Sequence, residues 1–254
     1  MKVDRPAAAR DFVRASRGAR TFPGVPEENY WFRRHEAAYR LALRVLGTRR
    51  RRILDVGCGE GYGSDVLRRA GPVVSVELDA AASAWATSAY PGSTVVRADA
   101  CRLPFRPGSF DAVVALQLAE HLYCPGEFVA AAARLLGPGG ILLVTTPNRE
   151  TSSPDGEPNP FHVHEYTASE LSGLLGTGFR RVRTAGIHPA AGLAVLGAAA
   201  GGSLHLRLAR TPFSQLPGWL RLGVRAVRAR HFRVGGTDGS LDLVAVAGHP
   251  FQPR

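Results

Sequence analysis

The sequence of 254 residues lacks several features that would place it in a special class of protein. It has no run of about 20 uninterrupted apolar residues, and residues 1–20 lack the apolar centre of a signal peptide, so we expect no transmembrane helix and a cytoplasmic location. Cysteine is scarce: Cys58, Cys101 and Cys124 are the only three, and none forms a Cys-x-x-Cys pair. We therefore expect reduced thiols and no disulfide framework.

Lysine is almost absent, because Lys2 is the only one and arginine supplies nearly all the positive charge. A formal net charge of +11 at pH 7 would suit nucleic acid or anionic lipid as a partner. The arginines are scattered, however, without the interleaved aromatic side chains of a groove for single-stranded nucleic acid. We expect a small-molecule partner rather than nucleic acid, and a homodimer is compatible with the sequence.

The composition is that of a globular protein, with 45% hydrophobic and 21% charged residues. At this length we expect one principal α/β domain with an elaboration. Apolar residues at helical spacing predict a helix over 28–46. Strands are then predicted at 51–57, 73–78, 93–99, 110–117 and 139–148, alternating with helices at 64–70, 80–89 and 126–136. Such alternation predicts parallel strands joined by right-handed crossovers, with helices on both faces.

The second half of the chain adds a loop, a helix and two strands. Residues 149–166 are polar and proline-rich and predict a loop, and Thr167 with Glu170 forms a capping-box pattern that begins a helix. Strands at 179–187 and 240–248 complete a predicted seven-stranded, mostly parallel, doubly wound sheet. We divide the chain into an N-terminal arm and helix, a core, an insertion or lid, and a terminal strand, at residues 1–47, 48–188, 189–237 and 238–254.

A glycine-rich turn follows the first predicted strand, where Asp55 stands two positions before the first glycine. Glycines here allow a sharp bend and the close approach of a ligand. They are Gly57, Gly59 and Gly61. Acidic residues also follow the next two strands. Glu77 can accept hydrogen bonds from both hydroxyls of a ribose, and Asp99 with the backbone N–H of Ala100 can bind an adenine.

This turn resembles motif I of the class I, Rossmann-like S-adenosylmethionine-dependent methyltransferases. Residues 99–114, DACRLPFRPGSFDAVV, are similar to the stretch of that family that leads into its fourth strand, and the resemblance covers about residues 50–180. It implies S-adenosyl-L-methionine (SAM) as the cofactor. A nicotinamide-dependent oxidoreductase is the alternative that a glycine-rich turn leaves open.

Candidate catalytic residues follow the fourth and fifth predicted strands. Gln117, Glu120 and His121 come after the fourth strand, and the loop after the fifth contains His162 and His164. The carboxyl ends of parallel strands share one edge of a sheet, so we expect these side chains to face the methyl group. A carboxylate with imidazoles suits a divalent cation such as Mg²⁺, which would lower the pKa of a coordinated hydroxyl. His164 is interpreted as a spare ligand or a solvated residue.

This set of candidate residues resembles the sites of two groups of methyltransferases. In the small-RNA 2′-O-methyltransferases, E-x-x-E-H and a later histidine segment hold magnesium. That resemblance implies Glu120, His121 and His162 as metal ligands. Gln117 stands where that group has its first glutamate, and we assign it to the cofactor side of the site.

Nearly the whole chain is similar to actinobacterial sugar O-methyltransferases of polymethylated polysaccharide synthesis. The shared segments include RHE at 34–36, CGEGYG at 58–63 and TPNR followed by NPFH. On this resemblance Arg34 and His35 close over the methionine carboxylate of the cofactor and the acceptor, or they are ordinary charges on a helix surface.

The predicted insertion at 189–237 is longer than the connections of about 2 to 6 residues that such folds need, and we expect it to shape the acceptor site. Within it, Arg221, Arg225 and Arg228 fall on one predicted helical face. A solvated surface is the favoured interpretation of this face, and contact with a membrane is the alternative.

The leading hypothesis is metal-assisted O-methylation of a sugar, a polyol or a natural product, with His121 as the base. One alternative is a metal-independent O- or N-methyltransferase of small molecules that uses His121 alone. Another is a cofactor-binding enzyme of this fold that does not methylate.

Overall fold

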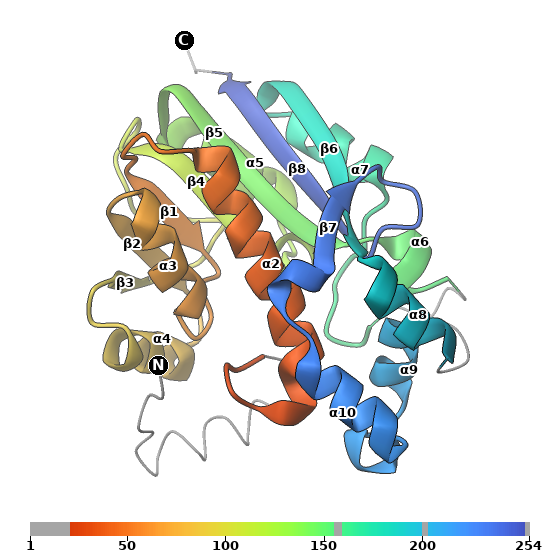
Figure 1. Ribbon diagram of the computed structural model, residues 1–254. Coiled ribbons are helices and arrows are strands. Elements are labelled where there is room, and N and C mark those ends of the chain that lie inside the picture. The colour runs from red at the N-terminus through yellow and green to blue at the C-terminus, as the bar shows by residue number, and fades with distance from the viewer. Residues whose placement is uncertain (1–20, 155–158, 200–202, 252–254) are drawn as a thin grey trace.

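The computed structural model describes residues 21–154, 159–199 and 203–251, and these form an α/β structure around one sheet (Figure 1). The strand order is β3-β2-β1-β4-β5-β8-β6-β7. The strands are β1 (Ile53–Val56), β2 (Val73–Glu77), β3 (Thr94–Arg97), β4 (Phe110–Leu116), β5 (Leu136–Pro147), β6 (Phe179–Pro189), β7 (Phe232–Gly235) and β8 (Asp242–Pro250). Strands β1 to β5 are parallel, and β8 runs antiparallel to both β5 and β6.

The sheet has eight strands, so the predicted seven is wrong by one. The extra strand, β7, comes from the predicted insertion and pairs antiparallel with Gly186–Pro189 at the end of β6. Its four residues are too few to show a period of two, and only Phe232 among them is buried. The strand forms because the end of β6 offers it unpaired backbone groups. The other seven predicted strands are confirmed.

Helices cover both faces of the sheet. They are α2 (Asn29–Leu46), α3 (Tyr62–Leu67), α4 (Ala80–Ala89), α5 (Pro125–Leu135), α6 (Arg149–Ser152), α7 (Ala168–Gly176), α8 (Ala191–Ala199), α9 (Leu204–Arg210) and α10 (Gly218–Ala226). Neighbouring residues of β1 point to opposite faces, since Ile53 packs in a core with α2 and Leu54 packs in a core with α5 and α7. Both residues are fully buried, as expected for a parallel strand covered on both sides.

The helices of the predicted insertion pack against α2. Leu193, Leu220 and Val224 share the core that contains Tyr30 of α2. The side-chain amide of Asn29, the first residue of α2, donates to the carbonyl oxygens of Val224 and Val227 at 2.9 and 3.1 Å. It thereby ties the first residue of α2 to the C-terminal end of α10, where the carbonyl groups lack the i+4 partners of a helix interior.

The prediction that three arginines share one face of a helix is wrong for Arg228. Helix α10 ends at Ala226, so Arg228 lies beyond it, and its guanidinium donates to the carbonyl oxygens of Arg225 and Val227. Such bonds from a basic side chain close the end of a helix, and the backbone turns away. Only Arg221 and Arg225 lie on the helix itself.

The prediction that all three cysteines are reduced thiols is also wrong. Cys101 and Cys124 form a disulfide across a sequence separation of 23, whereas Cys58 is free and buried. The loop after β3 and the residue before α5 meet because β3 and β4 end at the same edge of the sheet. A search for closely spaced cysteines cannot detect a pair that the sheet brings together.

Among the described helices, none is both long enough and apolar enough to cross a bilayer.

Candidate active site

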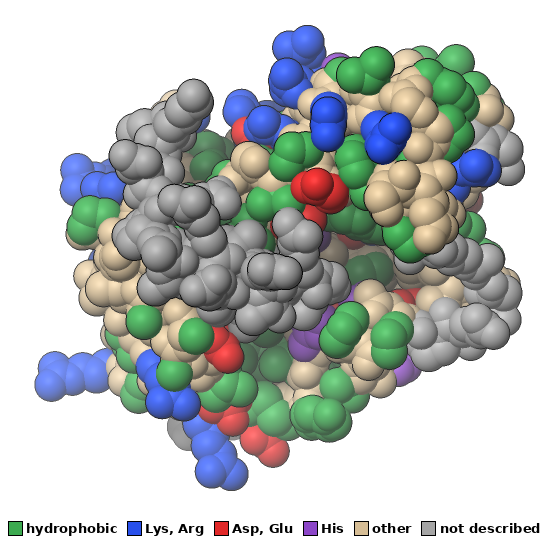
Figure 2. All heavy atoms as spheres, turned by 90° about the horizontal axis from the view of Figure 1, so that it is seen from below, with side chains coloured by type: hydrophobic (Ala, Val, Ile, Leu, Met, Phe, Trp, Pro, Cys, Tyr) green, Lys and Arg blue, Asp and Glu red, His purple; other side chains and the backbone are tan. Residues whose placement is uncertain are grey.

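The predicted site residues lie along the carboxyl edge of the parallel strands. Asp55 is the third of the four residues of β1, and Glu77 is the last residue of β2. Asp99 follows β3, and Gln117 follows β4 directly. Figure 2 views the molecule toward this edge and shows histidine side chains beside a recess in the surface. The structure therefore gathers, at one edge, residues that are up to about sixty positions apart in the sequence.

The glycine-rich turn after β1 has the backbone shape of a ligand cradle. Gly57, Gly59 and Gly61 have φ of 73°, 53° and 82°, which is the left-handed region that favours glycine. A Cβ atom at Gly57 would lie 2.8 Å from the side chain of Leu118, and one at Gly61 would lie 2.8 Å from the Cβ of Ala86. Side chains are thus excluded from the turn both by its conformation and by its neighbours.

Asp55 supports this turn from inside the protein. Its carboxylate is fully buried and accepts a 2.6 Å hydrogen bond from the Ser64 hydroxyl, which in turn accepts one from Ser75 at 2.9 Å. The pKa of Asp55 is raised to about 7, mainly by burial and in part by the nearby carboxylate of Glu77, while the hydrogen bond from Ser64 opposes this rise. Asp55 therefore organises the turn and does not face solvent.

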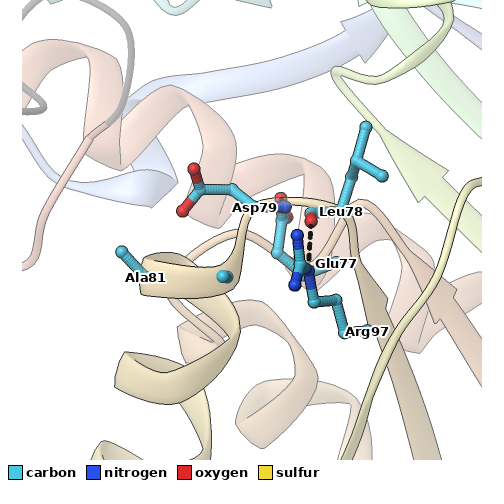
Figure 3. Close-up of a pocket in the computed structure, with 6 residues that line it drawn as sticks. Glu77, Leu78, Asp79, Ala81 and Arg97 are labelled. Carbon is cyan, nitrogen blue, oxygen red and sulfur yellow. Dashed lines mark hydrogen bonds between the residues drawn. The ribbon is translucent and has the colours of Figure 1, made fainter.

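Glu77 connects the turn to the next strand. Its two carboxylate oxygens accept the backbone N–H groups of Gly59 at 2.9 Å and Asp79 at 3.0 Å. A carboxylate at the end of this strand is a suitable acceptor for ribose hydroxyls. Glu77 also lines a pocket with Leu78 and Arg97, whose Nε donates to the Leu78 carbonyl oxygen at 3.1 Å (Figure 3).

Asp99 and Ala100, the predicted adenine site, follow β3 and are not among the residues that line this pocket. Asp99 is exposed, and its Oδ1 accepts the backbone N–H of Cys101 at 2.9 Å, while Ala100 is buried. The side chain of Leu78 is 62% exposed although it is apolar, and it offers an aliphatic surface in the pocket that Glu77 and Arg97 also line. A base with polar edges and apolar faces fits such a surface.

Asp242, the first residue of β8, is a polar centre that the sequence analysis did not assign. It is buried and accepts two hydrogen bonds from the Arg34 guanidinium and one from the Gln117 side chain, at 3.2 Å. Gln117 itself has φ of 55°, a strained conformation for a residue other than glycine, and its backbone N–H donates to Thr145. The sequence signal that could have identified Asp242 is that it is the one acidic residue in a mostly apolar terminal strand.

Helix α2 also presents His35 to the site. The Nδ1 of His35 lies 3.2 Å from the hydroxyl of Thr21. The pKa of His35 is lowered to about 4, mainly by burial and in part by the neighbouring Arg34 and His121, although Asp242 opposes this shift. His35 is therefore neutral at physiological pH.

Glu120, His121 and His162 lie together, as predicted. One potential ligand atom from each of the three falls within 4.8 Å of the others. The Nδ1 of His121 lies 2.8 Å from the carbonyl oxygen of Phe161. A carbonyl oxygen only accepts hydrogen bonds, so Nδ1 of His121 carries the proton and Nε2 carries the lone pair when the ring is neutral.

The same arrangement is found at His162, whose Nδ1 lies 2.7 Å from a carboxylate oxygen of Glu165. Glu165 is buried and also accepts the hydroxyl groups of Ser152 and Ser153. A carboxylate behind an imidazole fixes its orientation and raises its basicity, as at many metal centres. The 159–166 loop is held in place because the backbone N–H groups of residues 163 and 164 donate to the carbonyl oxygen of Glu120.

The Glu120 carboxylate is buried beside the two imidazoles, and its Oε2 has no hydrogen-bond partner in the part of the chain that the structure describes. Burial raises the pKa of Glu120 to about 8. A buried carboxylate with an unsatisfied oxygen is costly unless a proton or a cation balances it. His164 takes no part in this cluster, because it lies against Tyr166 and 3.7 Å from Glu170.

Comparisons with known proteins agree with this geometry. Residues 54–144 match the protein family described as "Methyltransferase domain". A probable S-adenosylmethionine-dependent methyltransferase of Mycolicibacterium smegmatis is 43% identical over 246 residues, which cover 92% of this chain and 94% of that protein. A ubiquinone biosynthesis O-methyltransferase of a Caulobacter species is 35% identical over 109 residues, which cover 39% of this chain and 41% of that protein.

Solved structures share the fold. A SAM-dependent methyltransferase of Thermotoga maritima superimposes with a TM-score of 0.59 at 19% identity, covering 86% of this chain and 92% of that one. At such low identity the similarity concerns the fold alone.

Proposed function

Because the chain belongs to the class I S-adenosylmethionine-dependent methyltransferases, we propose that it methylates a hydroxyl group of a sugar, a polyol or a related natural product. We further propose that a divalent cation held by Glu120, His121 and His162 assists this transfer, and that residues 189–237 shape the acceptor site. The observation that carries the proposal is the convergence of these three ligands within 4.8 Å.

The cofactor side of the site fits SAM. The left-handed glycines give the turn a backbone that a ligand can approach closely, Glu77 supports the turn and offers carboxylate oxygens to ribose hydroxyls, and Asp99 with Ala100 is the proposed adenine site. When bound, SAM supplies a methyl group carried on a positively charged sulfonium sulfur, and the leaving group of the transfer is a neutral thioether. The protein then needs only to align the acceptor oxygen and remove its proton.

A hydroxyl of ordinary acidity is a poor nucleophile and needs a base or a cation. The chain supplies two imidazoles whose Nδ1 atoms lie at hydrogen-bond distance from the Phe161 carbonyl oxygen and the Glu165 carboxylate, and one potential ligand atom of each ring lies within 4.8 Å of the others and of a Glu120 oxygen. Two nitrogen atoms and one carboxylate oxygen form a ligand set that suits a divalent metal with open positions. A cation there would also neutralise the buried charge of Glu120.

A second candidate function follows from the same geometry. His121 alone, with its Nε2 unprotonated, can serve as a general base for an acidic phenol without a metal. The Caulobacter relative, an O-methyltransferase of ubiquinone biosynthesis, favours this alternative over part of the chain.

Titration calorimetry with Mg²⁺ or Mn²⁺, and turnover with and without EDTA, separates the two candidates. The proposal expects one bound cation per chain, lost in Glu120→Gln and retained in His164→Ala, whose imidazole lies outside the cluster. Mass spectrometry of glycoside acceptors should show the gain of one CH₂. Turnover that EDTA does not change would exclude metal assistance, and the absence of a methylated hydroxyl from every sugar and polyol tested would exclude the acceptor class.

A further inference from the structure

Helices α8 and α10 belong to the 189–237 segment, and their outward side carries exposed side chains to which the proposed acceptor site assigns no role. Helix α8 contains no polar side chain, yet Val195 at its centre is 67% exposed. On α10, Trp219 and Leu222 are 50% and 67% exposed. We name the surface of Val195, Trp219, Arg221, Leu222 and Arg225 the α8–α10 face.

The exposed apolar side chains belong to one packed unit. Leu220 and Val224 of α10 are fully buried, so the opposite side of the helix, with Trp219 and Leu222 three positions apart, faces outward. Gly223 packs against Leu196 of α8, which places the residue after Leu222 in contact with the residue after Val195. An apolar face of this kind on a soluble domain indicates an interaction surface.

The charge of the same region is entirely positive. Residues 189–237 contain seven arginines and no aspartate or glutamate, and they supply seven of the eleven net positive charges of the chain. Arg225 is exposed and lies over the Phe213 ring at 5.6 Å, and Arg221 is half-buried one turn away. Within the described residues, neither arginine forms an ion pair. Figure 2 shows arginine and hydrophobic side chains interspersed over the part of the surface where α10 lies.

We propose that the α8–α10 face docks the protein on a bilayer of anionic phospholipid. Arginines would contact phosphate groups while Trp219, Leu222 and Val195 enter the interfacial region, which is how amphipathic helices bind membranes. A nucleic acid would use the arginines, but exposed aliphatic side chains such as Leu222 and Val195 offer it nothing. The positive charge also disfavours a second copy of the same face.

The position of the face in the fold gives the docking a consequence. Strand β8 is antiparallel to both β5 and β6, so β5 and β6 run in the same direction and end at the same edge. Helix α8 begins two residues after β6, and the loop that contains His162 follows β5. A bilayer bound to the α8–α10 face therefore lies at the edge of the sheet where the acceptor site opens.

Sedimentation of the full chain with sucrose-loaded vesicles tests the proposal without reference to turnover. Binding is expected with vesicles of 30% phosphatidylglycerol in phosphatidylcholine and to be at least about tenfold weaker with phosphatidylcholine alone. Arg221→Gln/Arg225→Gln should weaken binding about fivefold for each arginine removed. Trp219→Ser/Leu222→Ser should weaken it at least about tenfold, since it removes the inserting side chains.

Matched controls come from the opposite edge of the sheet. Arg180→Gln and Phe251→Ser alter an exposed arginine and the exposed ring beneath it, and vesicle binding should not change. Equal binding to both vesicle types, or unchanged binding by the Trp219→Ser/Leu222→Ser variant, would overturn the proposal. So would binding of a DNA oligonucleotide in place of vesicles, or a dimer that the same variant dissociates in analytical ultracentrifugation.

Discussion

Arg34 and Asp242 are 208 residues apart in the sequence, yet Nε and Nη2 of the arginine donate to the two carboxylate oxygens of the aspartate, both at 2.6 Å. Nη2 also donates to the carbonyl oxygen of Leu241. The side chains are only 4% and 2% exposed. This pair joins helix α2 to the start of β8 and lies next to Gln117, whose side chain donates to Asp242 at the carboxyl edge of the parallel strands.

Breaking this pair should destabilise the fold strongly, because the remaining charge is left buried. Arg34→Met or Asp242→Leu is expected to lower the free energy of unfolding by about 3 to 5 kcal/mol, measured by urea denaturation. The double variant should cost much less than the sum, since no unpaired charge remains. Arg52→Met is the control, because its ion pair with Asp111 is solvent-exposed and its loss should change the free energy of unfolding little. Additive effects at Arg34 and Asp242 would contradict this account.

The glycine turn should control cofactor affinity. Gly59→Val places a branched side chain at φ of 53°, within the turn that Glu77 supports, and is expected to weaken SAM binding about tenfold or more. Gly139→Val is a matched control, with φ of 72° and nothing within 4 Å of its added Cβ. Calorimetry on both folded variants is the measurement. Equal affinities would mean that the turn does not contact the cofactor.

Asp55 should make stability depend on pH in a defined direction. Burial raises its pKa from the usual 3.8 to about 7, so the folded state retains a proton that the unfolded state releases. Its contribution to the free energy of unfolding is therefore full below about pH 4 and declines as the pH rises to about 7. In Asp55→Asn, without cofactor, the decline between these values should be smaller than in the wild type. Thermal unfolding at several pH values measures it, and parallel profiles would show that Asp55 ionises normally.

If Glu120, His121 and His162 bind one cation, losing any of them should abolish the same step. Glu120→Gln and His162→Ala should each reduce turnover about 100-fold or more, and the double variant should be little worse than either. SAM affinity should not change, because neither residue belongs to the glycine turn. A nearly silent His162→Ala beside an inactive His121→Ala would instead identify His121 as a plain general base.

The disulfide predicts the thiol content of the purified protein. Denatured chain without reductant should yield one reactive thiol, that of Cys58, and reduction should raise the number to three. Because the bond closes a loop of 23 positions, Cys101→Ser should lower the free energy of unfolding by about 3 kcal/mol. Three reactive thiols before reduction would show that Cys101 and Cys124 are not joined in solution.

The sequence by itself determined the elements whose signals are local. Apolar runs that end in glycine or an acid predicted strands such as β1 and β2, and the turn after β1 predicted its own left-handed glycines, because backbone sterics act within a few residues. Sheet geometry extended these predictions to the gathering of Glu120, His121 and His162, since parallel strands end at a common edge.

Only the tertiary structure decided which distant groups became partners. The pairing of Arg34 with Asp242, the bond between Cys101 and Cys124 and the addition of β7 to the end of β6 each depend on how packed layers align segments far apart in the chain. No periodicity or spacing records such contacts. The burial that they create is also what shifts the pKa values of Asp55 and Glu120, because desolvation acts only after the core has closed around a carboxylate.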